Sequence, residues 1–340
     1  MSRLTELLPW AVCIALPAAF AAINSFDGAS AGGFLLVTNK GDRSLAIIDP
    51  ASGRQIAAVP EGGTTGHEVI ASPDGRTAYV PIYGNSGVGS PGTDGSNLAV
   101  VDLGARKVTG NVDFGHGVRP HCPLFGPKDG LLYVTTELDN SVTVIDPHTL
   151  KIVGSIPTEQ PEAHMLAITR DGRRGYTANV GPGTVSVLDL EARKNAGVIH
   201  VSPKVQRISL SHDDRMVFTS DQTKPQLAVI DTKTNEVTQW VPLPATGYGT
   251  AATLDGRHLL VAVPPTNQVA VVDLGAMKVI HTIDLPKAPQ EVLIRPDNRV
   301  AYVSCDSSGQ VAEIGLGDWK VNRLIAAGKG ADGLAWAGGR

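Results

Sequence analysis

The chain repeats one short pattern at nearly regular intervals, and this repeat limits what it can fold into. Most units contain a tight Asp-Gly or Asp-Asn turn, which supplies the carboxylate and the positive φ that a short hairpin needs. Equivalent turn positions are Pro73, Pro127, Arg170, His212, Leu254, Pro296 and Ala337. The first interval spans 54 residues and the others span 41 to 43 residues.

A second element of the repeat is an apolar strand that ends in aspartate. Its six copies are Leu45–Asp49, Leu98–Asp102, Val142–Asp146, Val185–Asp189, Leu227–Asp231 and Val269–Asp273. A seventh copy, Val311–Gly315, lacks the aspartate, and we interpret the six carboxylates as Asx-turn acceptors. Four strands in about 40 to 45 residues is the size of one propeller blade. The sequence therefore predicts an all-β, seven-bladed β-propeller with four antiparallel strands per blade.

The two ends of the repeat region are each incomplete. The region begins with a second strand near Phe34 to Thr38 and ends with a lone first strand, Ala331 to Ala337. We expect these strands to share one blade, because pairing them closes the ring and protects both sheet edges. Residues 34–340 then form one domain, preceded by a linker at 22–33.

The first 21 residues resemble a secretory signal peptide. Arg3 is followed by an apolar run from Leu7, and Ala19-Phe20-Ala21 offers small residues for cleavage. An uncleaved anchor is the alternative, but the run of about 17 residues falls short of the roughly 20 that a membrane helix needs. We expect a periplasmic or secreted protein with no stable membrane span after cleavage.

Charge and cysteine content exclude several classes of function. Lysine and arginine total 29 against 33 acidic residues, so no basic field predicts a nucleic-acid partner. The mature chain keeps Cys122 and Cys305, which the repeat places on different, non-adjacent blades, so we expect no disulfide between them. The chain has no Cys-x-x-Cys-His motif, and we therefore expect no c-type heme.

Three segments resemble the Tyr-Val-Thr-Asn (YVTN) type of bacterial β-propeller. They are Leu36–Asn39, Tyr133–Thr136 and Tyr302–Cys305, and the resemblance covers essentially the mature chain. It implies a propeller that is exported or displayed at the surface, without implying one activity. This family is similar in architecture to heme d1 domains and amine dehydrogenase propellers. Because heme d1 domains typically have eight blades, the count of seven argues against that branch.

Polar residues recur six positions before each turn marker. They are His67, His121, His164, Gln206, Tyr248 and Gln290, with Ala331 in the last copy. The first strand of each propeller blade lines the central channel, so three neighbouring blades should present histidine at one level. Arg119, Glu162 and Arg207 lie beside these positions in the sequence, and we expect all of them to meet at one mouth of the channel.

Three converging imidazoles predict a possible metal site. His67, His121 and His164 could surround one divalent ion, and Zn, Cu, Ni or Mn would each suit such ligands. The arrangement is similar in kind to the manganese site of propeller oligogalacturonate lyases. The alternative is that these side chains line a wet channel and hydrogen-bond to water or backbone.

Two classes of function follow from this mouth. The first is a protein that binds a small molecule or an envelope protein through Arg119, Glu162, Gln206, Arg207, Tyr248 and Gln290. The second is a metal-dependent lyase, lactonase or oxidoreductase that uses Glu162 or Tyr248 in proton transfer. The extra residues of the first interval lie at Gly84 to Ser96. We interpret this segment either as a lid over the mouth or as an insertion that the fold tolerates.

Overall fold

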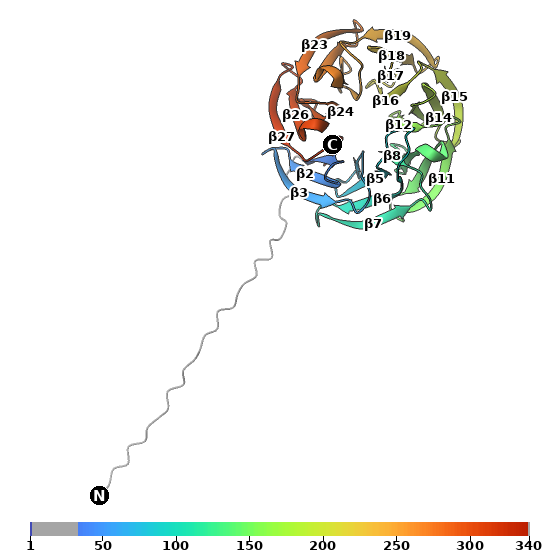
Figure 1. Cartoon of the computed structure of the whole chain (residues 1–340). Helices are drawn as coiled ribbons and strands as arrows, with labels where there is room; N and C mark the ends of the chain where they lie inside the picture. The colour runs from blue at the N-terminus through green and yellow to red at the C-terminus, as the bar shows by residue number, and fades with distance from the viewer. Residues whose placement is uncertain (2–32, 339–340) are drawn as a thin grey trace.

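The computed structural model describes residue 1 and residues 33–338 of the chain. Within this part, seven four-stranded antiparallel sheets are arranged as the blades of a ring (Figure 1). This confirms the predicted seven-bladed propeller. The predicted signal peptide and all but the last residue of the linker fall at residues 2–32, outside the described part apart from Met1. None of the described helices is long and apolar enough to cross a lipid bilayer.

We number the blades from the one that holds the start of the repeat region. Each blade runs from an inner strand at the central channel to an outer strand at the rim. Blade 1 consists, from the inside outward, of β28 (Ala331–Ala337), β1 (Phe34–Asn39), β2 (Ser44–Asp49) and β3 (Arg54–Pro60). The next three blades are blade 2, with β4 (Ile70–Ala71), β5 (Thr77–Gly84), β6 (Asp94–Asp102) and β7 (Lys107–Asp113); blade 3, with β8 (Pro120–Phe125), β9 (Leu132–Thr136), β10 (Ser141–Asp146) and β11 (Lys151–Pro157); and blade 4, with β12 (Ala163–Ile168), β13 (Arg174–Asn179), β14 (Thr184–Asp189) and β15 (Lys194–His200). The last three are blade 5, with β16 (Val205–Leu210), β17 (Met216–Asp221), β18 (Gln226–Asp231) and β19 (Glu236–Pro242); blade 6, with β20 (Thr250–Ala252), β21 (His258–Val263), β22 (Gln268–Asp273) and β23 (Lys278–Asp284); and blade 7, with β24 (Pro289–Ile294), β25 (Val300–Cys305), β26 (Gln310–Gly315) and β27 (Val321–Ala326).

Blade 1 joins the two ends of the described chain, as predicted. Strand β28 pairs with β1 from Phe34 opposite Ala337 to Asn39 opposite Ala331. The pairing gives β1 an inner neighbour, so the ring is closed by backbone hydrogen bonds between the two ends of the described chain. The hydrophobic core lies between blades rather than inside one of them. One cluster, for example, packs Val100 of β6 against Val134 of β9.

The turn chemistry of the repeat is also confirmed. Each of the six repeated aspartates accepts hydrogen bonds from backbone N–H groups two or three residues further on, as Asp231 does from Lys233 and Thr234 at 2.8 and 2.9 Å. Each carboxylate therefore closes the turn between the third and fourth strands of its blade.

The inner strands carry a β-bulge near their first residues. The register with the second strand shifts between Pro120 and Pro123 in β8, and at the same place in β12, β16 and β24. A bulge re-aims side chains and leaves backbone groups without ladder partners. In blade 3, the Thr135 hydroxyl accepts a hydrogen bond from the Cys122 N–H at 2.9 Å and donates one to the His164 carbonyl at 2.8 Å. The threonine of the repeat thus links a bulge to the next blade.

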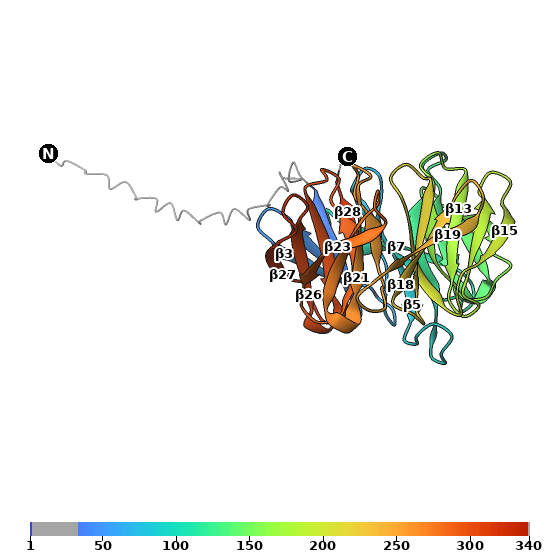
Figure 2. The same cartoon turned by 90° about the horizontal axis from the view of Figure 1, so that it is seen from above.

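The short 3-10 helix η1 (Glu137–Asp139) and the long β5–β6 hairpin lie on the face where the inner strands begin, as do η2 (Pro264–Thr266) and η3 (Asp306–Ser308). We call the opening of the channel on this face the mouth. Figure 2 shows the β5–β6 loop projecting beyond the neighbouring loops at the lower edge of the molecule. The extra residues of the first interval therefore lie on the mouth face, as expected.

Candidate functional site

Two successive positions near the start of the inner strands supply the mouth with side chains, the first on every blade and the second on blades 2, 5 and 7. The first position, which we call the mouth ring, holds His67, His121, His164, Gln206, Tyr248, Gln290 and Asp332. The register places Ala331 opposite Asn39, as Ala163 lies opposite Asn179 in blade 4. Asp332, and not Ala331, is therefore the equivalent of His164. The sequence pattern predicted Ala331 instead of Asp332 at this position. The error arose because the last repeat has no hairpin turn after its first strand, so its alignment with the other repeats was one residue off.

The three predicted histidines are neighbours. The ring centroids of His121 and His164 lie 3.6 Å apart, and those of His67 and His121 lie 5.5 Å apart. Tyr83, at the end of β5, contacts all three rings with centroid distances of 4.7 to 5.9 Å. The imidazoles of three consecutive blades therefore lie next to one another at the mouth.

Burial keeps the three imidazoles neutral. It lowers the pKa of His67 to about 4, and it lowers the pKa of His121 and His164 as well. His121 and His164 are only 1% and 3% exposed, and the Nδ1 atom of each is buried without a hydrogen-bond partner. Near neutral pH the site therefore offers uncharged nitrogen lone pairs.

A buried carboxylate that the sequence analysis did not identify stands behind one histidine. Glu137 begins η1, is 1% exposed, and places Oε2 at 3.4 Å from His164 Nδ1. The Tyr83 hydroxyl donates to the same oxygen at 2.6 Å, and the Arg119 guanidinium donates to Oε1 at 3.3 Å. Although burial opposes ionisation, these neighbours keep the pKa of Glu137 below its ordinary value. The one sequence feature that could have pointed to Glu137 is that it directly follows a predicted strand that ends on the mouth face.

Arg207 crosses the channel at the second position. Its Nη1 atom donates to Glu68 of blade 2 and to Glu291 of blade 7, both at 2.6 Å, and Nη2 lies 3.4 Å from Asp332. The ring of Tyr248 packs on the guanidinium with a centroid distance of 4.8 Å. The sequence prediction named Arg207 and Tyr248 but none of the three carboxylates. Strict strand alternation would place this position between blades, whereas the bulge turns it into the channel.

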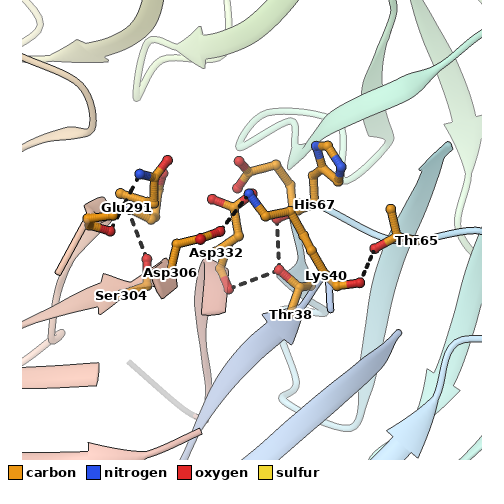
Figure 3. A network of polar contacts seen from close by, with 12 residues as sticks. Thr38, Lys40, Thr65, His67, Glu291, Ser304, Asp306 and Asp332 are labelled. Atoms are coloured by element: carbon orange, nitrogen blue, oxygen red, sulfur yellow. Dashed lines mark hydrogen bonds and ion pairs between the residues drawn. The ribbon is translucent and has the colours of Figure 1, made fainter. Parts of the chain in front are cut away.

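Lys40 extends this ionic network toward the mouth. Its Nζ atom lies 3.0 Å from Asp306 and 3.1 Å from Asp332, as Figure 3 shows. Burial raises the pKa of Glu68 and of Glu291, which share one guanidinium nitrogen. Despite burial, Lys40 and Arg207 hold the pKa of Asp332 below its ordinary value. In this network four carboxyl groups surround the two cations Lys40 and Arg207. Both cations are therefore already paired and have no excess positive charge to attract a further anion.

The remaining predicted ligand-binding residues divide between two sides of the mouth. Gln206 donates to the Tyr248 hydroxyl at 2.8 Å, and a small cavity of about 250 Å³ is lined by Tyr248, Gln290 and Gln222 among others. Glu162 lies on the opposite side, before β12, where a Cβ atom on Gly89 would come within 2.7 Å of its Oε1. The structure thus brings the predicted residues to one mouth, with histidines and Glu162 on one side and amides on the other.

The cysteines behave as predicted. Cys122 and Cys305 are both buried and free. Burial raises the pKa of each thiol, which makes both unreactive. Cys122 packs in the core between blades, where its Sγ atom lies 3.6 Å from the Leu166 carbonyl.

Comparison with known proteins places the chain in a family. A family model described as cytochrome D1 heme domain matches residues 125–314, more than half of the chain. The chain belongs to the cytochrome D1 heme domain family. The matched span of this heme domain runs from the end of β8 to the end of β26. It includes Glu137, His164 and Arg207 and leaves out His67 and His121.

Two individual proteins are similar to this D1 heme domain member. One solved structure, titled Kuenenia stuttgartiensis Hydrazine Synthase, has a TM-score of 0.67 and 18% identity, and the match covers 80% of this chain and 89% of that chain. At this identity the likeness shows the fold alone. The 6-phosphogluconolactonase of Bacillus subtilis (strain 168) is 28% identical over 115 residues, 27% of this chain. The chain spans about a third of that relative's length.

The family match corrects the cofactor prediction. The sequence analysis named Zn, Cu, Ni or Mn as the cofactor and expected no c-type heme, whereas the family is that of a heme domain. The count of seven blades was therefore a poor argument against this branch. Among the described residues, no group of three or more His, Cys, Asp or Glu is arranged to hold a metal ion. The resemblance to Tyr-Val-Thr-Asn repeats stays a prediction.

The histidine side of the mouth fits a heme group in its donor chemistry. His164 is a neutral imidazole with the Glu137 carboxylate 3.4 Å from Nδ1, and a proton on Nδ1 directed at this carboxylate would leave Nε2 as the ligating nitrogen. The stacked rings of His121 and His164, tilted by 33°, direct their lone pairs past one another rather than toward one point. The donor set therefore suits ligation by one imidazole better than chelation by three.

Proposed function

We propose that this protein binds a heme-type tetrapyrrole at its mouth and that His164 is the side chain that would hold its iron. The proposal is supported by one observation above all, the buried Glu137 carboxylate placed behind His164 Nδ1 at 3.4 Å. A histidine that ligates a metal usually donates its other ring N–H to a carboxylate. His164 also lies inside the span that matches the heme-domain family, unlike His67 and His121.

Glu137 would act by orienting the imidazole. Its two oxygens are already held by Tyr83 and Arg119, so the carboxylate cannot swing away from the ring. A small rotation of His164 would align Nδ1–H with Glu137 Oε2 and direct the Nε2 lone pair toward the ligand. The carboxylate would also increase the basicity of the imidazole.

The other mouth residues would bind the rest of the ligand. Gln206, Tyr248 and Gln290 present amide and hydroxyl groups on the side opposite the histidines. The Arg207 network closes the channel beneath the mouth ring, because it ties blade 5 to blades 2 and 7. Binding would therefore take place at the mouth and not deeper in the channel.

A bound heme iron would supply one-electron chemistry and an exchangeable ligand position. Tyr83 and the buried histidines shield this side of the mouth from bulk water. In line with the predicted signal peptide, we place this function in the periplasm or outside the cell. A small molecule is the partner that this site favours over an envelope protein, since the chemical groups converge on a point rather than on a flat surface.

Spectroscopic titration with ferric heme tests the proposal. We expect the purified mature protein to shift the main visible absorption band of heme with one-to-one stoichiometry. The His164→Ala variant should bind at least roughly tenfold more weakly and lose the spectrum of a histidine-ligated iron. His116→Ala is a matched control, because His116 is exposed and pairs with Asp139 on the surface.

Two results would contradict the proposal. One is a heme spectrum in His164→Ala that is identical to that of the unchanged protein, which would move the ligand elsewhere. The other is the absence of any saturable spectral change in the unchanged protein.

A further inference from the structure

Arg119 connects the β5–β6 loop to the carboxylate behind His164. Its Nε atom donates to Asp94 at 2.6 Å and Nη2 donates to the Ser90 carbonyl at 2.7 Å. Nη1 donates to Glu137 at 3.3 Å, on the inner side. Arg119 holds this position with a φ of 51°, in the left-handed region that favours glycine. One buried guanidinium thus joins an external loop to the interior of the mouth.

The loop has little else to hold it in place. Residues 85–93 contain three glycines and no large apolar residue other than Val88, and its tip lies beside Glu162 of blade 4. The loop begins in blade 2, so it passes the start of blade 3 to reach that residue. It therefore covers the side of the mouth where His121 and His164 are buried.

Arg119 differs from the other two mouth cations in the exposure of its partner. The side chains of Glu68, Glu291 and Asp332, which hold Arg207, are 6%, 20% and 4% exposed. Lys40 pairs with the buried Asp332 and with Asp306, whose side chain is 28% exposed. Asp94, in contrast, has a side chain that is 36% exposed and sits at the base of the loop. Of these three cations, Arg119 therefore has the carboxylate partner with the most exposed side chain, which is the easiest for a ligand to displace.

We infer that Arg119 is the residue of the mouth that binds a carboxylate of the ligand, and that Asp94 occupies it until the ligand displaces Asp94 together with the loop. The β5–β6 loop is then a lid over the mouth. The contact that holds the lid closed, which we call the latch, is made by the same Arg119 guanidinium that recognises the ligand. An arginine–carboxylate pair is a strong and directional contact, so the exchange replaces one such pair by another. The inference deepens the proposed function, on which its ligand experiment rests.

Hydrogen exchange of the ligand-free protein tests the latch. Backbone amides of residues 85–93 should exchange roughly tenfold faster in Asp94→Asn and in Arg119→Gln than in the unchanged protein. Glu191→Gln is the control, since it removes an exposed partner of Lys128 far from the loop and should leave these amides unchanged. Equal protection of the loop in all four proteins would overturn the latch.

Ferric heme and its dimethyl ester test the class of ligand. The unchanged protein should bind the free acid roughly tenfold more tightly than the ester, and Arg119→Gln should bind the two with equal affinity. Asp94→Asn should bind the free acid more tightly than the unchanged protein does, because the competing carboxylate is gone. A thermal melt confirms that each variant is folded.

The outcomes separate this inference from the proposed function. Equal binding of acid and ester by the unchanged protein, with a histidine-ligated spectrum, would overturn the carboxylate assignment and leave the proposed role of His164 standing. Failure of both compounds to bind would overturn the proposed function and the carboxylate assignment together, while the exchange data would still decide the latch.

Discussion

Glu61, the residue after β3, shows how one buried group can make the stability of this protein depend on pH. It is 2% exposed and accepts a hydrogen bond from the Gly66 N–H at 2.7 Å through Oε2, while Oε1 has no partner. Burial raises its pKa to about 7. A carboxyl group whose pKa is higher in the folded state destabilises that state once the pH exceeds the unfolded value.

Glu61→Gln should therefore stabilise the protein mainly at alkaline pH. Glutamine keeps an acceptor for Gly66 and removes the ionisation that the fold opposes. The free energy of unfolding should rise by about 3 kcal/mol at pH 8.5 and by about 1 kcal/mol at pH 5. Urea unfolding at the two pH values measures this, and an equal gain at both would show that Glu61 is not the responsible group.

The elements of the fold show how far the sequence could predict the site. The turn spacing and the six repeated aspartates predicted the number of blades, because local turns recur visibly in a sequence. The same spacing predicted that His121 and His164 would lie on neighbouring blades at one level, and their ring centroids lie 3.6 Å apart. It did not predict the contacts of Arg207, because a bulge in β16 breaks strand alternation, and bulges leave no clear mark in a single sequence. Glu137 follows a repeated strand motif, but the residue at this position differs from blade to blade, so only the tertiary structure shows that Glu137 lies behind His164.

The bulge of β8 carries a prediction at the level of this element. Thr135 is fully buried and satisfies the Cys122 N–H and the His164 carbonyl. Thr135→Val keeps the volume and leaves both groups without a partner, so the free energy of unfolding should fall by about 2 to 3 kcal/mol. Thr135→Ser keeps the hydroxyl and should lose less. Urea unfolding compares them, and equal losses in the two variants would point to packing rather than hydrogen bonding.

The whole ring depends on the pairing of β28 with β1. Their register joins Leu36 to Ala335 and Val37 to Leu334, and Ala331 and Leu334 also belong to the core shared with blade 7. Deleting the last ten residues should therefore lower the melting temperature of the entire domain in one transition, instead of fraying one end. A truncated protein that melts at the temperature of the full mature chain would show that the ring does not need this strand.

The position of β28 has a consequence for how the molecule is made. A ribosome produces β1 near the beginning of the chain and β28 near its end, so blade 1 lacks its inner strand during nearly the whole of synthesis. Asp332, which anchors both Lys40 and Arg207, arrives with that strand. The ionic network of the channel can therefore assemble only after every other blade has been translated.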